Sequence, residues 1–102
     1  MIVYNVTCNV SHDISEEWFQ WMTDVHIPEV MNLGIFISSR VHKVITGNDE
    51  GVTYAISYTC NEMKDLHRYQ IEFASILQQK HSLRYGNKVV AFRTILEVIR
   101  NF

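Results

Sequence analysis

The length and composition of the chain fit one globular domain: it has 102 residues, of which 47% are hydrophobic and 20% are charged, so residues 1–102 are expected to form a single domain. Nine Lys and Arg residues against eleven Asp and Glu residues leave a formal charge of −2. Because no basic excess is present, neither nucleic acid nor an anionic membrane surface is an expected partner.

The first expected elements are a strand and a helix. Residues 2–10 alternate between apolar and more polar side chains, which is typical of a strand with one apolar face. Residues 11–17 then offer Ser and Asp as N-caps and acidic residues for a first helical turn. Apolar residues follow at helical spacing at Trp18, Trp21, Met22 and Val25. Pro28 is expected to end or kink this helix near Ile27, and Gly34 to close the segment.

Two neighbouring strands are expected next. Residues 35–46 are rich in β-branched side chains and predict the second strand. Residues 47–51 read Gly-Asn-Asp-Glu-Gly and predict a hairpin loop. Residues 52–60 alternate in the same way as residues 2–10 and predict the third strand.

A second helix and a last strand complete the chain. Residues 59–62 have the spacing of a capping box and are expected to open the helix. Its apolar stripe is expected to contain Leu66, Tyr69, Phe73, Ile76, Leu77 and Lys80. Gly86 marks its end, and residues 88–99 predict the fourth strand.

The order β-α-β-β-α-β predicts an α+β fold of the ferredoxin-like type. In this fold a four-stranded antiparallel sheet carries both helices on one face, with the first and third strands at its centre. The residues expected on the bare face are Asn5, Thr7, Ser57, Arg93 and Glu97, beside Val3, Ala55, Val89, Ala91 and Ile95. Since this mixture is too apolar for a solvated surface, we expect a second copy of the chain to cover it in a homodimeric α+β barrel.

The cysteines and the N-terminus bear on the cellular compartment. Cys8 and Cys60 are too few for a zinc quartet and fall at opposite ends of adjacent antiparallel strands, so neither a metal site nor a disulfide is expected. The first residues show no export signal, and no apolar run approaches the ~20 residues that cross a bilayer. A cytoplasmic protein with no membrane partner is therefore expected.

His26 is the centre of the candidate site. The residues that the topology is expected to bring beside it are Tyr4, Tyr58, Cys60 and His67. His81 should lie about a strand length away, roughly 20 Å. An imidazole beside two phenols could transfer protons, because histidine titrates near neutrality and tyrosine can donate to a developing oxyanion. The alternative interpretation is structural, with His26 bonded to a phenol or to a carbonyl that Pro28 leaves free.

One resemblance rests on residues 1–6, 17–22, 25–30, 51–54, 91–94 and 96–98. These stretches resemble a family of short bacterial proteins known as a domain of unknown function. Such proteins look like members of the dimeric α+β-barrel group, in which His26-x-Pro28 is similar to the element that ends the first helix of some small enzymes and stress proteins. The resemblance implies the ferredoxin-like fold and a dimer, but it transfers no catalytic role because the family has no assigned chemistry.

That group includes haem-degrading proteins, which suggests a test of His81 as a haem ligand. A haem-degrading relative would also need an Asn on the first strand and an aromatic residue on the third. Asn5 and Tyr58 occupy such positions, but their parity places them on opposite faces of the sheet. No cofactor is therefore expected.

Charged residues expected on the bare face allow two interpretations. They are Arg93 and Glu97 on the fourth strand and Arg40 and His42 on the second. They could hold a small anion in the barrel lumen. Alternatively, they could pair across a dimer interface, where arginine is enriched.

Two functional classes remain open. The first is a homodimer that binds a small apolar or carboxylated molecule, or that has a regulatory role, without converting its ligand. The second is a cofactor-independent isomerase or monooxygenase with His26 as acid or base, assisted by Tyr4 or Tyr58. No nucleophile with an adjacent base, no phosphate-binding glycine loop and no metal cluster supports other enzyme classes. The sequence leaves open whether the chain is an enzyme.

Overall fold

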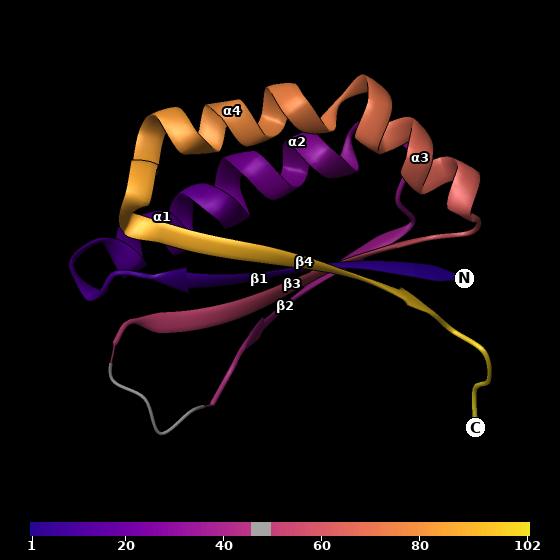
Figure 1. The fold of residues 1–102 in the computed structure, drawn as a ribbon, viewed down its shortest axis with the longest axis horizontal. Coiled ribbons are helices and arrows are strands. Elements are labelled where there is room, and N and C mark those ends of the chain that lie inside the picture. Colours follow the sequence, from indigo (N-terminus) through magenta and orange to yellow (C-terminus); the bar gives the residue numbers. More distant parts are fainter. Residues whose placement is uncertain (46–49) are drawn as a thin grey trace.

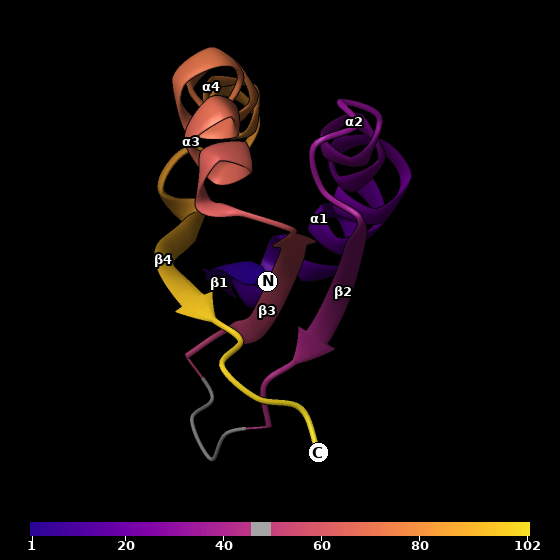
Figure 2. The ribbon, with the colours of Figure 1, turned by 90° about the vertical axis from the view of Figure 1, so that its right-hand side faces the viewer.

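Four antiparallel strands form one sheet, and the helices lie on one side of it (Figures 1 and 2). The computed structural model describes residues 1–45 and 50–102. The strands are β1 (Ile2–Val10), β2 (Ser38–Lys43), β3 (Val52–Cys60) and β4 (Val89–Glu97). Their order across the sheet is β2-β3-β1-β4. The predicted α+β, ferredoxin-like fold is confirmed, with the first and third strands at its centre.

The first helical segment is longer than expected and changes type along its length. It comprises the 3₁₀ turn η1 (His12–Ile14), α1 (Ser15–Trp21), the π-helical stretch η2 (Met22–His26) and α2 (Ile27–Met31). Of the two outcomes expected at Pro28, an end or a kink, the end is not observed, because the helix continues to Met31. A proline has no N–H for the carbonyl four residues earlier, and the wider π turn that precedes it accommodates this loss without stopping the helix. Gly34 closes the segment at φ +75°, as expected.

The second helical segment is interrupted. A capping box joins Glu62 and Asp65 at the start of α3 (Met63–Glu72). It lies three residues later than the box expected over residues 59–62, because residues 59 and 60 still belong to β3. Phe73, with φ −128° and ψ −33°, separates α3 from α4 (Ala74–Tyr85). This break shifts the helical phase. The expected stripe is therefore correct at Leu66, Tyr69 and Leu77, which are buried, but wrong at Ile76 and Lys80, which are exposed.

Two strands are shorter than their sequence pattern predicts. Ile35 and Phe36 are buried in the core before β2 begins, so their apolar character reflects loop packing and not strand pairing. Residue 46 and most of the expected hairpin loop at 47–51 lie outside the described residues. After the 3₁₀ turn η3 (Gly86–Lys88), β4 begins at Val89 and ends at Glu97 instead of at residue 99.

The strand register decides which side chains face the helices. Tyr4 is paired with Tyr58 of β3 and with Ile95 of β4, and Val6 is paired with Arg93. Because paired residues project to the same side, the odd-numbered residues of β4 face the helices. The expectation that Arg93 and Glu97 lie on the bare face is therefore wrong, as it is for Val89, Ala91 and Ile95. Both parities of β4 carry apolar side chains, so the alternation could not reveal the register.

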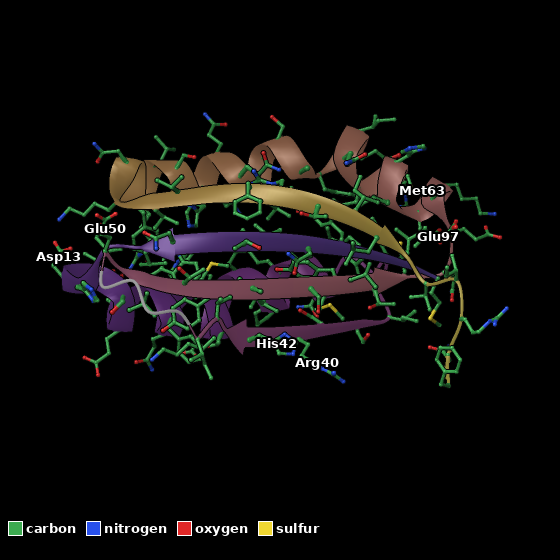
Figure 3. The ribbon with its side chains drawn as sticks, turned by 60° about the horizontal axis from the view of Figure 1, so that its bottom comes forward. Asp13, Arg40, His42, Glu50, Met63 and Glu97 are labelled. Atoms are coloured by element: carbon green, nitrogen blue, oxygen red, sulfur yellow. The ribbon has the colours of Figure 1, made fainter. Side chains whose placement is uncertain are left out.

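Figure 3 brings forward the side of the sheet away from the helices, here called the uncovered face. By the strand register, this face carries the opposite parities. It contains Val3, Asn5, Thr7, Ala55 and Ser57, as expected, and Val90, Phe92 and Leu96 from β4. Arg40 and His42 lie on it at the β2 edge, also as expected. Its most exposed large apolar side chains are Val90, Phe92 and Leu96.

The hydrophobic core lies between the sheet and the helices, with Trp18, Ile56 and Leu66 fully buried. Cys8 and Cys60 are free thiols, and their partners Tyr54 and Ile2 place them at opposite ends of the β1–β3 pair, which confirms that they form no disulfide. Within residues 1–45 and 50–102, no helix combines the length and apolar character needed to cross a membrane.

Candidate functional site

A cavity of about 260 Å³ lies between the covered face of the sheet and the helices. The sheet contributes side chains that include Tyr4 and Cys8 of β1, Tyr58 of β3, and Ala91 and Arg93 of β4. The helices contribute Met22, His26, Tyr69, Gln78, His81 and Ser82. The three residues proposed from sequence, His26, Tyr4 and Tyr58, therefore line one space.

Two histidines, His26 and His81, line the helical side of the cavity and are neighbours. Their ring centroids are 6.2 Å apart, so the expected separation of roughly 20 Å is wrong. The helix continues beyond Pro28, which places His26 within the first helical segment and not at its end. α4 runs back alongside this segment in the opposite direction (Figures 1 and 2) and brings His81 to the same level.

His26 is a neutral imidazole in this setting. Burial, followed by the proximity of His81, lowers the pKa of His26 to about 4. Its ring packs against Trp21 at a centroid distance of 5.3 Å. Within the described part of the chain no hydrogen bond engages its nitrogens, so the predicted bond to a phenol or a backbone carbonyl is not observed. The nitrogens remain available to a bound molecule.

His81 is hydrogen-bonded to a residue of the hydrophobic core, Trp18. The Nε1–H of the fully buried Trp18 donates a hydrogen bond of 2.9 Å to Nε2 of His81. In the neutral ring this bond places the proton on Nδ1. Burial lowers the pKa of His81, and Arg93 adds to the effect. Since the Nε2 lone pair already accepts a bond, His81 is poorly suited to be a haem ligand.

Three tyrosines form the aromatic wall of the cavity. The ring centroid of Tyr4 lies 5.8 Å from that of Tyr69 and 6.4 Å from that of Tyr58. Burial raises the pKa of Tyr69 to about 12 and also raises the pKa values of Tyr58 and Tyr4. These phenols are therefore protonated at neutral pH and can donate hydrogen bonds.

Arg93 is the site residue that the sequence pattern misplaced. It is the one cavity-lining side chain, among the residues described, that carries a formal charge at neutral pH. Its guanidinium opposes the effect of burial on Tyr4 and draws the pKa of that phenol back down. Arg93 could have been assigned to the cavity only from the β1–β4 register, which the sequence does not reveal.

Two other residues expected near His26 do not reach the cavity. Cys60 is buried, but it is not among the side chains that line this space, and His67 is exposed on α3. The cysteine that does line it is Cys8, whose pKa burial raises to about 11. It is therefore a neutral thiol and not an activated nucleophile. Among the residues described, no group of three potential metal ligands occurs.

The fold of the chain resembles several solved proteins. A "putative antibiotic biosynthesis monooxygenase" from Deinococcus radiodurans aligns with a TM-score of 0.71 and 15% identity, over 100% of this chain and 96% of its own. An ethyl tert-butyl ether d (EthD) family protein from Bacillus halodurans aligns with a TM-score of 0.68 and 12% identity, over 97% and 100%. A dimeric ferredoxin-like protein from an uncultured marine organism aligns with a TM-score of 0.67 and 13% identity, over 99% and 96%. At these levels of sequence identity, the similarity to the three proteins shows a shared fold and nothing about function.

Sequence comparison identifies the family of the chain. No curated protein matches it significantly. The family described as "Domain of unknown function (DUF4286)" matches residues 1–99. The match covers nearly all of the chain and agrees with the resemblance found in its residues. The chain therefore belongs to the DUF4286 family.

Proposed function

We propose that this protein is a homodimer that binds a small molecule in the cavity of each protomer. The observation that carries the proposal is the cavity itself, which combines aromatic walls with a neutral imidazole, His26, that has no hydrogen-bond partner among the described residues. Apolar walls with a few convergent polar groups are typical of ligand sites. The volume of about 260 Å³ is just below the usual range of roughly 300–1,000 Å³, so the ligand is small.

The uncovered face supports the homodimer. Val90, Phe92 and Leu96 are 67%, 62% and 49% exposed on the same face of β4. Apolar groups gathered on one face typically mark an interaction surface. A solved protein of the same fold is described as dimeric. A second sheet packed face to face would cover these side chains and avoid an exposed apolar surface.

Catalysis by His26 is less well supported than binding. A general acid or base works best when its pKa lies near the working pH. The pKa of His26 is lowered to about 4 and that of Tyr69 is raised to about 12, so both pKa values lie far from neutral pH. The cofactor-independent isomerase or monooxygenase therefore stays an alternative that no feature of the cavity favours.

Methyl NMR tests the binding proposal with benzamide as the probe. In protein labelled at Ala, Ile, Val and Met methyls, the reporters in the cavity wall are Val6, Met22, Ile56, Val89 and Ala91. We expect benzamide to shift these methyl signals and to leave Val3, Ala55 and Val90 on the uncovered face unchanged. Ala91→Leu, which fills part of the cavity, should abolish the shifts. Unchanged cavity methyls at millimolar benzamide would refute the ligand site.

Sedimentation velocity tests the dimer. We expect the wild-type protein to sediment as a dimer at micromolar concentration and Phe92→Glu to sediment as a monomer, because the new charge would be buried in the interface. Ile76→Glu is the matched control, since Ile76 is 61% exposed on the helical side. A wild-type monomer, or equal dissociation in both variants, would contradict the interface.

A further inference from the structure

Arg93 stands where the cavity meets the molecular surface. It is exposed, and it lines both the cavity and an open groove formed with α3 and α4. Tyr4, Gln78 and Ser82 are shared between the cavity and the groove in the same way. These four residues, here called the mouth, define where a ligand enters and where one end of it would rest.

The mouth carries a positive charge, that of Arg93. Among residues 1–45 and 50–102, no Asp or Glu lines either the cavity or the groove. Within the described residues Arg93 makes no salt bridge, whereas Arg84 on the neighbouring helix is paired with Glu17. An arginine without a carboxylate partner beside a partly enclosed, aromatic space is the group that binds an organic anion, because its guanidinium matches a carboxylate in charge and shape.

The neighbours of Arg93 reinforce this preference. Tyr4 is a protonated phenol, and Ser82 and the amide of Gln78 can donate hydrogen bonds. Burial keeps His26 and His81 neutral, so the histidines add no further positive charge. The net charge lining the cavity is therefore that of one guanidinium, which a single carboxylate neutralises.

We propose that the ligand is a small aromatic or apolar monocarboxylate, with its carboxylate at Arg93 and its body among Tyr4, Tyr58 and Tyr69. This inference rests on the proposed function and specifies its ligand class. Tyrosine faces and edges accept a flat apolar group, and the volume of about 260 Å³ suits a molecule with one ring. His26 also lines the cavity and offers a hydrogen-bonding group to the bound molecule.

The test compares benzoate with benzamide, which have nearly the same shape but differ in charge. Affinities are measured from the shifts of the cavity methyls at neutral pH in the wild type and in three variants. We expect benzoate to bind roughly ten- to a hundredfold more tightly than benzamide, as a charge-assisted hydrogen bond implies. Arg93→Gln should remove this advantage by weakening benzoate binding far more than benzamide binding, whereas Arg93→Lys should restore part of it. Arg40→Gln, on the uncovered face, should change neither affinity.

The outcomes separate the two proposals. Equal affinity of the wild type for benzoate and benzamide, or an unchanged benzoate preference in Arg93→Gln, would overturn the anion assignment and leave the cavity as a site for neutral molecules. Failure of both probes to shift the cavity methyls would overturn both proposals. Shifts confined to methyls outside the cavity would show that the carboxylate binds elsewhere, which also overturns the assignment.

Discussion

Acidification from pH 7 to pH 5 should destabilise this protein through His26. In the folded chain its imidazole is kept neutral mainly by burial, with additional repulsion from His81 and Lys80. Glu29 acts in the opposite sense, but the combined effect lowers the pKa of His26 from 6.5 to about 4. The unfolded chain has no such burial, so its His26 accepts a proton more readily.

The magnitude follows from proton linkage. Between pH 6.5 and pH 4 the unfolded state binds more protons at this position, so the free energy of unfolding falls as the pH falls. At pH 5 the unfolded imidazole is almost fully protonated, while the folded one is about nine-tenths neutral. Integrated from pH 7 to pH 5 at 1.36 kcal/mol per pH unit, the difference removes about 2 kcal/mol of the free energy of unfolding. The lowered pKa of His81 acts with the same sign.

Urea denaturation at one protein concentration measures this loss at both pH values. The wild type should lose about 2 kcal/mol more than His26→Gln, in which the titrating group is absent. His67→Gln, which removes an exposed imidazole from α3, should behave as the wild type does. An equal loss in the wild type and in His26→Gln would show that His26 titrates alike in both states and would refute its assignment as a buried neutral imidazole.

Three substitutions test the scaffold, each by the free energy of unfolding in urea. His81→Ala should cost about 1–3 kcal/mol, because it leaves the fully buried indole N–H of Trp18 without an acceptor; a neutral effect would contradict the bond. Gly51→Ala should cost at least about 1 kcal/mol, since φ is +134° and a Cβ would lie 2.7 Å from Oδ1 of Asn9. Asp65→Ala should cost about 1 kcal/mol by opening the α3 capping box, and an unchanged midpoint would argue against that cap.

The strands were predictable from sequence because their alternation is strong. β1 and β3 agree with the predicted residues 2–10 and 52–60 at both ends. In each strand one parity carries the larger apolar side chains, so burial of one face fixes its orientation. In β4 the larger apolar residues Val90, Phe92 and Leu96 face away from the helices, whereas Arg93 and Glu97 share the parity that faces them. Its existence was predictable, but its orientation was not.

The two helical segments and their order were predictable, but their division into α1, α2, α3 and α4 was not. A proline indicates a local disturbance, yet the sequence does not say whether the helix stops or absorbs it in a π turn. Nothing in the residues around Phe73 predicts the break there, because the helical pattern continues across it. The distance between His26 and His81 depends on how far the first segment extends and where α4 lies beside it. The histidine pair was therefore beyond sequence reasoning, even though the sequence had made His26 a candidate site residue.

The cavity arises from a particular combination of large and small residues. Tyr4 and Tyr58 are paired across β1 and β3, and Tyr69 meets them from α3, so three rings occupy the space between the layers at one level. Cys8 and Ala91 are paired across β1 and β4 at another level, and both are small. A close-packed interior would place large side chains opposite such a pair. From α4 the lining receives Gln78, His81 and Ser82, so polar groups lie beside the aromatic wall of a space that stays open. The site is thus a property of this register and these side chains, which the ferredoxin-like topology alone does not specify.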